Sequence, residues 1–469
     1  MTIPVTAFTL AELARATNGE CNQTDQAQTR FAKVTIDTRA LQAGDLFVAL
    51  PGPNFDGHDY VSYAAEQGAS AALVEHPVQT AIPEVVVSNT RKALGEFASA
   101  WRNHFDYPVI AITGSNGKTT VKQLTAGIAA CHGATLATQG NLNNELGVPL
   151  TLLNMREEHR TAVIEMGANH AGEIRYLAQL ARPTVGIVTN AAPSHLEGFG
   201  DLDGVAHAKG ELFENLQDGG TAIINADDNY ADLWRDLASP RRVLSFGLHG
   251  NADFTVDTET LYVNTDHSRF ALQTPDGPVD VTLPLPGEHN VANALAAAAA
   301  AWAVGAKREH IAQGLAQVRN VGGRLQVKQS HLGACVVDDT YNANPASLAA
   351  ALRWAGSLNM PVWLVLGDMR ELGAREALLH TEAGRQAREA GVQRLFTLGE
   401  LSQNATQAFG RGAEHFTDVE ALLATLTHAL SSGMIVLVKG SRGMRMERVV
   451  SALLNGNKTG NQEPSVGAH

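Results

Sequence analysis

The sequence predicts an α/β protein of three domains. With 469 residues, the chain is long enough for about three domains of ordinary size. Short apolar runs alternate with helical segments over most of its length, as is typical of buried parallel strands joined by crossover helices. Two such series are separated by Gly322-Gly323, where we expect a hinge. We therefore place domains at residues 1–88, 89–320 and 321–455, followed by a polar tail at 456–469.

The first predicted domain differs from the other two in its pattern of apolar runs. It holds short strands, such as those within "AKVTIDTRAL" and "GDLFVAL", at residues 32–41 and 44–50. No phosphate-binding loop and no series of strands and crossover helices is visible in it.

The central region shows a repeated strand–helix pattern. An apolar run at residues 109–113 is followed by a glycine-rich turn and a helical stretch. Further apolar runs occur in "TAVIEMG", "VGIVTN" and "TAIINAD". This order predicts a doubly wound, mostly parallel sheet. Residues 253–285 alternate between polar and apolar and carry turn signals, so we expect an antiparallel annex there.

The third region repeats the strand–helix alternation. Its apolar runs lie in "GACVVDDTY", "PVWLVLGD", "RLFTLGE" and "GMIVLVKGSR", with helical segments between them. These runs predict a second, Rossmann-like α/β domain.

Composition excludes several classes of function. The formal net charge of -13 argues against a broad nucleic-acid surface. No apolar run is long enough to span a bilayer, and the N-terminal residues do not resemble a signal peptide, so we expect a cytoplasmic protein. The three cysteines are far apart and lack metal-ligand spacing.

The glycine-rich turn, "GSNGKTT" at residues 114–120, predicts a nucleotide site. The usual P-loop pattern places a glycine where this chain has Ile112. The turn nevertheless lies between a buried strand and a helix N-terminus, where free N–H groups and the helix dipole attract anions. Lys118 can reach terminal phosphates, and the Thr119 hydroxyl can bind Mg²⁺. The alternative is a tight glycine turn with a surface lysine.

Other candidates fall where strands end or helices begin. Glu165 ends one apolar run and His195 lies just beyond the next, so both should reach the sheet edge that binds ligands. Each could instead be structural. Asn290 and Asn293 share one helix face and could present amides to a heterocycle, although Asn290 could be an N-cap. Composition alone would make Lys209 a solvated helix lysine.

Taken together, these motifs resemble the ATP-dependent Mur ligases of peptidoglycan synthesis. The resemblance runs over about residues 30–450 and rests on motifs in one order. They are "GSNGKTT", "EMG", "HLEGFG", "AKGE", "GEHNVANALAA" and "GGR". Ser115 stands where many family members have Thr. In this family the short loop has no distant first glycine, so Gly114 takes that role.

The resemblance implies a uridine-nucleotide substrate domain, a central P-loop-type ATP domain and a C-terminal domain that closes over the site. "GNLNNELGVPLTLL" and "DDTYNANPAS" are similar to the member that adds D-alanyl-D-alanine to UDP-MurNAc-tripeptide through an acyl phosphate. ATP and two Mg²⁺ ions would be required, and we expect a monomer. A related ligase or a folylpolyglutamate-synthetase-like enzyme, with another acceptor, remains an alternative. A P-loop switch ATPase is another.

The resemblance also assigns roles by position. Catalytic residues would be Lys118, Glu165, His195, Lys209 and Arg324. ATP would contact Gly114, Ser115, Asn116, Gly117, Lys118, Thr119, Thr120, Asn290, Asn293, Arg324 and Asp339. The UDP-sugar substrate would contact Thr38, Arg39, Asn143 and Asn144, and the dipeptide would lie near Asn342, Asn344 and Ser347. Metal ligands would be Thr119, Glu165, His195 and Lys209, the last as a carbamate.

Overall fold

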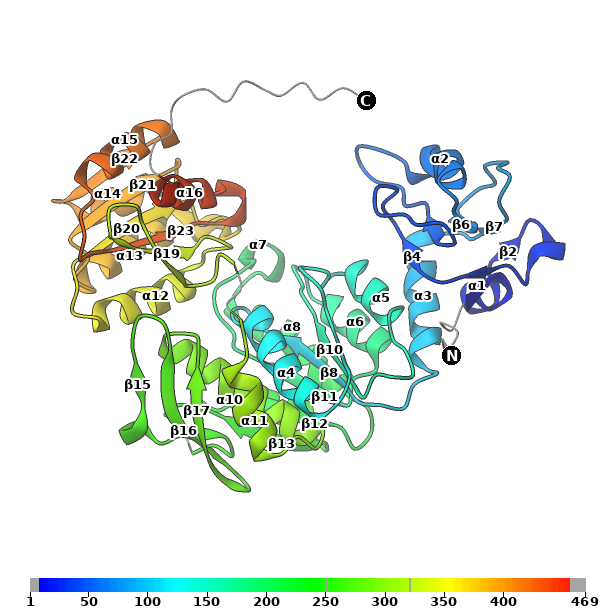
Figure 1. Cartoon of the computed structure of the whole chain (residues 1–469), viewed down its shortest axis with the longest axis horizontal. Coiled ribbons are helices and arrows are strands. Elements are labelled where there is room, and N and C mark those ends of the chain that lie inside the picture. The colour runs from blue at the N-terminus through cyan, green and yellow to red at the C-terminus, as the bar shows by residue number, and fades with distance from the viewer. Residues whose placement is uncertain (1–7, 250, 320–321, 456–469) are drawn as a thin grey trace.

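The computed structural model describes residues 8–249, 251–319 and 322–455. It is an α/β protein of three domains, as predicted. The domains form an arc, with the first and third at its two ends and the central domain between them (Figure 1). The predicted polar tail at 456–469 lies outside the described residues, as do residues 320 and 321 beside the predicted hinge.

The first domain contains a five-stranded sheet in the order β2-β7-β6-β5-β4. Its strands are β2 (Glu20–Cys21), β4 (Val34–Thr35), β5 (Leu46–Val48), β6 (Ala71–Val74) and β7 (Glu84–Val86). Only β2 is antiparallel to its neighbour, and α2 (Val61–Glu66) lies on the connection from β5 to β6. The structure therefore contains parallel strands and one crossover helix that are not visible in the sequence. Strands of two to four residues are too short to stand out as apolar runs.

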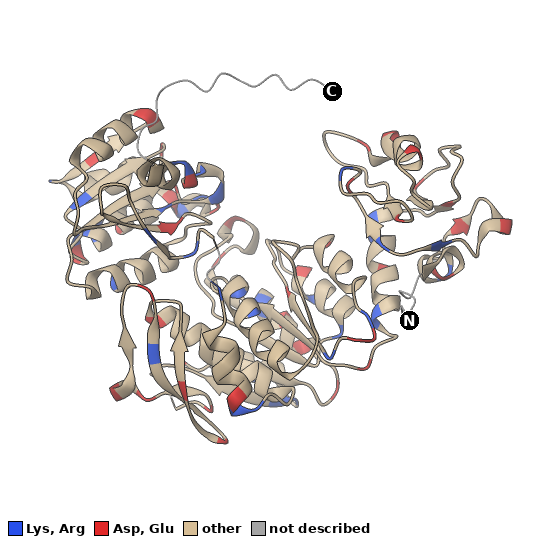
Figure 2. Cartoon of the chain, in the orientation of Figure 1, with Lys and Arg blue, Asp and Glu red and all other residues tan. Residues whose placement is uncertain are grey.

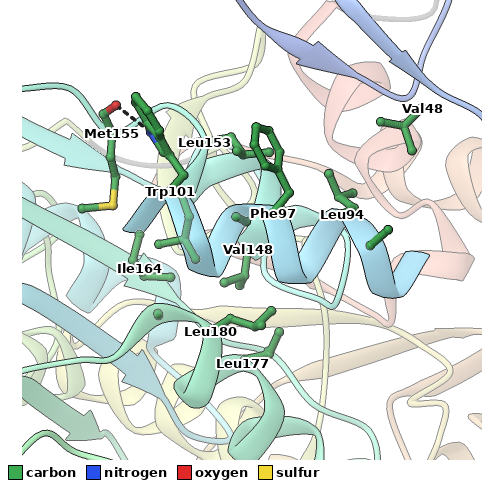
Figure 3. Close-up of a cluster of buried hydrophobic side chains, with 14 of the residues drawn as sticks. Val48, Leu94, Phe97, Trp101, Val148, Leu153, Met155, Ile164, Leu177 and Leu180 are labelled. Atoms are coloured by element: carbon green, nitrogen blue, oxygen red, sulfur yellow. Dashed lines mark hydrogen bonds between the residues drawn. The ribbon is translucent and has the colours of Figure 1, made fainter. Parts of the chain in front are cut away.

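A shared core joins the first domain to the central one. α3 (Thr90–Arg102) packs Phe97 and Trp101 against Phe8. Phe8 lies in β1 (Phe8–Thr9), which pairs with β3 (Arg30–Phe31). The same helix meets Val148 and Leu177 of the central domain (Figure 3). Trp101 Nε1 donates a hydrogen bond to the Met155 carbonyl at 3.2 Å. A continuous hydrophobic core, and not a bare linker, therefore holds these two domains together.

The central sheet is entirely parallel, in the order β13-β12-β11-β8-β10-β9. Its strands are β8 (Val109–Thr113), β9 (Thr135–Ala137), β10 (Thr161–Glu165), β11 (Val185–Val188), β12 (Thr221–Asn225) and β13 (Arg242–Phe246). The accompanying helices are α4 (Lys118–His132), α5 (Gly147–Leu152), α6 (Glu173–Ala181), α7 (Leu196–Phe199), α8 (Leu202–Glu214), α9 (Ala231–Ala238), α10 (Glu288–Ala303) and α11 (Arg308–Ala316). The residues of β8 and β10 are fully buried, which explains their continuous apolar sequence.

The predicted annex is antiparallel. It comprises β14 (Thr255–Val256), β15 (Tyr262–Val263), β16 (Ser268–Thr274) and β17 (Gly277–Leu283). Buried residues alternate with more exposed ones along β17, as expected for a sheet with one face on the core. The annex also reaches the third domain, because Trp354 Nε1 donates to the Asn264 carbonyl at 3.0 Å.

The third domain has a six-stranded sheet in the order β18-β19-β23-β20-β21-β22. Its strands are β18 (Gln326–Gln329), β19 (Cys335–Asp339), β20 (Val362–Gly367), β21 (Arg394–Leu398), β22 (Ala413–Phe416) and β23 (Ile435–Lys439). The helices of this domain are α12 (Pro345–Ser357), α13 (Glu376–Glu389), α14 (Gln403–Phe409), α15 (Val419–Ala429) and α16 (Glu447–Asn455). The first domain also contains α1 (Leu10–Thr17). Only the edge strand β18 is antiparallel. Separate hydrophobic clusters cover the two faces of this sheet.

Charged residues of both signs are scattered over all three domains (Figure 2). Within the described ranges, no helix combines the length and the apolar character needed to cross a membrane.

Candidate active site

A cavity of about 870 Å³ lies between the central and third domains. Most of the predicted site residues line it. They are Ser115, Asn116, Gly117, Lys118, Thr119, Thr120, Asn143, Asn144, Glu165, His195, Asn290, Asn293, Arg324, Asp339, Asn342, Asn344 and Ser347. The cavity thus collects the carboxyl ends of several strands from two sheets, where open α/β sheets bind ligands.

Two glycines shape the loop between β8 and α4. Gly114 has φ 138°, and a Cβ there would overlap the Thr189 hydroxyl. Gly117 has φ 83°, and a Cβ there would lie 2.5 Å from Asn293 Oδ1. Both positions therefore need glycine, because side chains disfavour this backbone region and have no space here. The helix that follows begins at Lys118, and its first N–H groups lack intrahelical acceptors.

The loop is fastened to the segment after β11. The Ser115 hydroxyl donates to the Ala192 carbonyl at 2.9 Å, and the Ser115 N–H donates to the Asn190 carbonyl at 3.0 Å. The Asn116 N–H donates to Asn190 Oδ1 at 3.0 Å. Since these groups are engaged within the protein, the N–H groups at the start of α4 are the better phosphate donors.

Lys118 folds back over the loop. Its Nζ donates to the Gly114 carbonyl at 2.6 Å and to the Ser115 carbonyl at 3.3 Å. Burial lowers the pKa of Lys118, with Arg324 acting in the same direction and Glu165 opposing. The ammonium therefore already stands at the mouth of the loop where phosphates would bind.

Glu165 is the carboxylate at the centre of the site. It ends β10, is 2% exposed, and accepts hydrogen bonds at Oε1 from Thr119 at 3.1 Å and from Asn143 Nδ2 at 2.9 Å. Among the described atoms, no hydrogen-bond donor serves Oε2, although Lys122 Nζ lies 3.7 Å away. A buried carboxylate oxygen in this state fits a divalent cation. Sequence reasoning missed Lys122, which looks like an ordinary helix lysine.

His195 is held by a residue of the third domain. Its Nδ1 lies 2.7 Å from Glu371 Oε2, and His195 has φ 50° just before α7. Burial lowers the pKa of His195, and the Glu371 charge opposes this effect. Glu371 was not predicted, because nothing in its local sequence marks it as a neighbour of residue 195.

Lys209 is 1% exposed, so the expectation from composition of a solvated lysine was wrong. It lies in α8, where Nζ donates to the Ala168 carbonyl at 3.4 Å and sits 4.9 Å from the centre of the Phe199 ring. Burial lowers the pKa of Lys209 to about 7, and the positive charge of Lys118 contributes. Packing of α8 against the loop after β10, and not local sequence, creates this environment.

The start of α10 forms another wall. Gly287 is the N-cap of this helix, so the alternative of Asn290 as N-cap was wrong. Asn290 Nδ2 instead donates to the Pro286 carbonyl at 2.7 Å, and Asn293 Nδ2 donates to Asn290 Oδ1 at 3.2 Å. The neighbouring His289 also lines the cavity, and burial lowers its pKa to about 4. His289 was not predicted.

Arg324 reaches from the third domain to the phosphate loop. Its Nη2 donates to the Thr119 hydroxyl at 2.9 Å, and its guanidinium lies 4.0 Å from the centre of the Tyr341 ring. Asp339, at the end of β19, accepts from Lys439 Nζ at 2.6 Å and from the Leu325 N–H at 3.1 Å. Lys439 is 2% exposed and was not predicted.

The loop before α12 also contacts the phosphate loop. Asn344 caps α12 in a capping box with Ser347, and its Nδ2 donates to Asn116 Oδ1 at 2.8 Å. The Asn342 carbonyl accepts from Lys439 Nζ at 3.0 Å. Two of the three residues expected near the dipeptide thus have a helix-capping task as well.

Four predicted residues do not line the cavity: Thr38, Arg39, Gly114 and Lys209. Arg39 pairs with Asp37 at 2.7 Å on the first domain, and its hydrogen bond holds the pKa of Asp37 at about 2. The first domain lies at the far end of the arc from the third (Figure 1). Asn144 lines the cavity and accepts from the Gly147 N–H at 2.9 Å at the start of α5.

The donor set fits Mg²⁺ held partly by the protein. Within the described residues, no group of three His, Cys, Asp or Glu side chains could hold a metal alone. Mg²⁺ commonly takes one or two carboxylates together with water and substrate phosphates, and Glu165 with Thr119 offers such a partial set.

Comparisons with known proteins cover nearly the whole chain. Family models match as "Mur ligase family, catalytic domain" over residues 30–105, "Mur ligase middle domain" over 112–301 and "Mur ligase, glutamate ligase domain" over 323–442. A relative from Escherichia coli (strain K12), UDP-N-acetylmuramoyl-tripeptide--D-alanyl-D-alanine ligase, is 45% identical over 95% of this chain and 98% of its own.

Solved structures give the same result. A crystal structure of MurF from Acinetobacter baumannii is similar with a TM-score of 0.91 and 36% identity, covering 96% of this chain and all of the other. A complex of MurF ligase from Thermotoga maritima with ADP has a TM-score of 0.81 and 26% identity, over 90% and 96% of the two chains. The chain therefore belongs to the Mur ligase family.

Proposed function

We propose that this protein is an ATP-dependent ligase that adds D-alanyl-D-alanine to UDP-N-acetylmuramoyl-tripeptide in peptidoglycan precursor synthesis, releasing ADP and phosphate. The observation that carries the proposal is the meeting of Arg324, Thr119 and Glu165 at one point. There, a cation from the third domain adjoins the phosphate loop and a carboxylate suited to a metal. The relative named above supplies the choice of substrates.

ATP would lie along the cavity from α10 to the start of α4. Asn290 and Asn293 would face adenine, and Asp339 would bind the ribose. Within the loop Gly114–Thr120, the N–H groups at the start of α4 would bind the phosphates together with Lys118. Lys118 already points into the loop, so it needs only to exchange carbonyl partners for phosphate oxygens.

UDP-MurNAc-tripeptide would bridge the first and central domains. Thr38 and Arg39 would bind the nucleotide end, and Asn143 and Asn144 would guide the peptide towards Glu165. The shared core around Trp101 supports this arrangement, because it fixes the distance between the two ends of a long substrate.

The reaction joins a carboxylate to an amine, so the carboxylate must first be activated. Its oxygen would attack the γ-phosphorus of ATP, forming an acyl phosphate and releasing ADP. The dipeptide amine would then attack the acyl carbon, and phosphate would leave. Lys118 and Arg324 would offset the repulsion between the anionic reactants. One Mg²⁺ bound near Thr119, and a second held by Glu165 and His195 beside carbamylated Lys209, would supply further positive charge.

The environment of Lys209 favours a carbamate. Its neutral amine can attack CO₂, forming an N–C bond and losing one proton. With a pKa of about 7, roughly half of the amine is neutral at pH 7, whereas an ordinary lysine is almost wholly protonated. Carbamylation would exchange a buried cation for an anion beside the metal site.

The third domain would close over the site about the predicted hinge and bring Arg324 to the phosphates. Closure would also shield the acyl phosphate from water. Asn342, Asn344 and Ser347 would border the dipeptide, at the face that meets the phosphate loop. We further propose a monomer acting in the cytoplasm, with ATP and two Mg²⁺ ions.

Phosphate release tests the function. ATP hydrolysis should require both UDP-MurNAc-tripeptide and D-alanyl-D-alanine, and the product should be the pentapeptide. Release that ignores both substrates would favour a P-loop switch ATPase. Turnover with another amino acid in place of the dipeptide would favour a related ligase or a folylpolyglutamate-synthetase-like enzyme.

A further inference from the structure

One side-chain pair joins the third domain to the metal-binding side of the cavity. Glu371 lies in the loop between β20 and α13, and its Oε2 is 2.7 Å from His195 Nδ1. The two residues are 176 positions apart and belong to different domains. The Glu371 side chain is 60% exposed and the His195 side chain 30%, so neither is a core residue.

The backbone on both sides is shaped for this contact. His195 has φ 50° and Glu371 has φ 66°, and both lie in the left-handed region that non-glycine residues disfavour. Gly373, with φ 63°, brings the same loop against α7, because a Cβ there would lie 3.6 Å from the Glu197 nitrogen. Two uncommon backbone conformations thus coincide at one ion pair, and such conformations cluster at functional sites.

The contact engages one of the two ring nitrogens of His195, a residue that lines the cavity. With Nδ1 turned to Glu371, Nδ1 carries the proton and donates a hydrogen bond to the carboxylate. Nε2, on the other side of the ring, then keeps its lone pair and faces away from Glu371. A carboxylate on the distal nitrogen of a metal-binding histidine fixes the tautomer and orientation of the ring in this way.

We propose that Glu371 is a positioning residue that orients His195 for the metal, and that the third domain supplies it only when packed against α7. This inference rests on the metal role of His195 in the proposed function. It gives domain closure a second effect beside the delivery of Arg324. Because Arg324–Thr119 and Asn344–Asn116 hold the same interface, loss of Glu371 should disturb His195 without releasing the domain.

The test measures metal binding directly. Mn²⁺, a paramagnetic substitute for Mg²⁺, is titrated into the full-length protein with saturating ADP, and free Mn²⁺ is followed by electron paramagnetic resonance. We expect Glu371→Ala to weaken Mn²⁺ binding about 10-fold to 100-fold, as is usual for the loss of such a partner. Glu389→Gln, an exposed acid at the end of α13, is the matched control and should bind as the wild type does. Thermal unfolding confirms that each variant is folded.

A double variant distinguishes two roles of Glu371: orienting His195, or only holding the third domain in place. In a His195→Ala background, Glu371→Ala should change the Mn²⁺ affinity less than about twofold, since the residue that it positions is gone. A full further loss in the double variant would overturn the inference, as would wild-type Mn²⁺ affinity in Glu371→Ala. If His195→Ala itself leaves Mn²⁺ binding intact, the metal role of His195 in the proposed function fails. If His195→Ala weakens binding while Glu371→Ala does not, only the positioning role fails.

Discussion

The rate at which Lys209 takes up CO₂ should level off above neutral pH. Only the neutral amine reacts with CO₂, so the uptake rate follows the fraction of Lys209 that is deprotonated. Burial and the charge of Lys118 lower the pKa of Lys209 to about 7. The neutral fraction is then about 9% at pH 6, about 90% at pH 8 and nearly complete at pH 9. The rate should therefore rise about tenfold from pH 6 to pH 8 and hardly change from pH 8 to pH 9.

An unperturbed lysine gives a different profile. With a pKa near 10.4, the neutral fraction would climb about tenfold for each pH unit throughout this range. The two cases differ most clearly between pH 8 and pH 9, where the buried lysine predicts a plateau. The sign follows from burial, which disfavours the charged form and so makes the reactive form available at lower pH.

The assay starts from protein freed of CO₂ and metal. Samples are incubated at a fixed concentration of dissolved CO₂ at pH 6, 7, 8 and 9. Aliquots are withdrawn over time into a standard phosphate-release assay at one pH with ATP and Mg²⁺. Carbon-13 NMR with labelled CO₂ detects the carbamate itself, and Lys209→Ala should show neither the signal nor the regained activity. A rate that still rises tenfold from pH 8 to pH 9 would refute the buried-amine argument.

Three further predictions concern the phosphate loop and the shared core. Arg324→Ala should lower kcat about 10³-fold or more, because this loss is usual for an arginine that stabilises a transferring phosphoryl group. Steady-state kinetics in which only KM changes would contradict this role. Gly114→Ala should weaken ADP binding at least tenfold in calorimetry because its Cβ overlaps Thr189, whereas Gly219→Ala, with positive φ but nothing within 4 Å, should bind ADP normally. Trp101→Ala should destabilise the first two domains together by about 3–5 kcal/mol in denaturant unfolding, and a separate unfolding step for the first domain would disprove the shared core.

Site residues were predictable from the sequence where they stand at the end of an apolar strand or directly after it. Gly114, Lys118 and Glu165 end or follow apolar runs, and the carboxyl ends of parallel strands meet at one edge. Arg324 follows no strand, and its place in the site was expected only from the family resemblance. Sheet topology alone is enough to place Gly114, Lys118 and Glu165 at that edge.

Other features depend on packing that no short segment encodes. The local sequence around Lys209 is typical of a surface lysine. Only the packing of α8 against the loop after β10 shows that its side chain is buried. Glu371 and Lys439 become site residues only because the third domain meets the central one. The parallel series of the first domain escaped prediction for another reason: its strands of two to four residues leave no periodic signal.

Basic side chains gather around Glu165 although the chain as a whole is acidic, and this arrangement bears on function. The protein carries a formal net charge of -13, yet Lys122 Nζ lies 3.7 Å from Glu165, and Arg324 donates to the Thr119 hydroxyl that in turn donates to Glu165. Burial lowers the pKa of Lys118 and of Lys122, and the positive charge of Arg324 acts in the same direction on both. Such a site gains most from a polyanionic ligand. A nucleoside triphosphate and a carboxylate meet that need together, and a carbamate on Lys209 would remove one of the cations that compete with a metal.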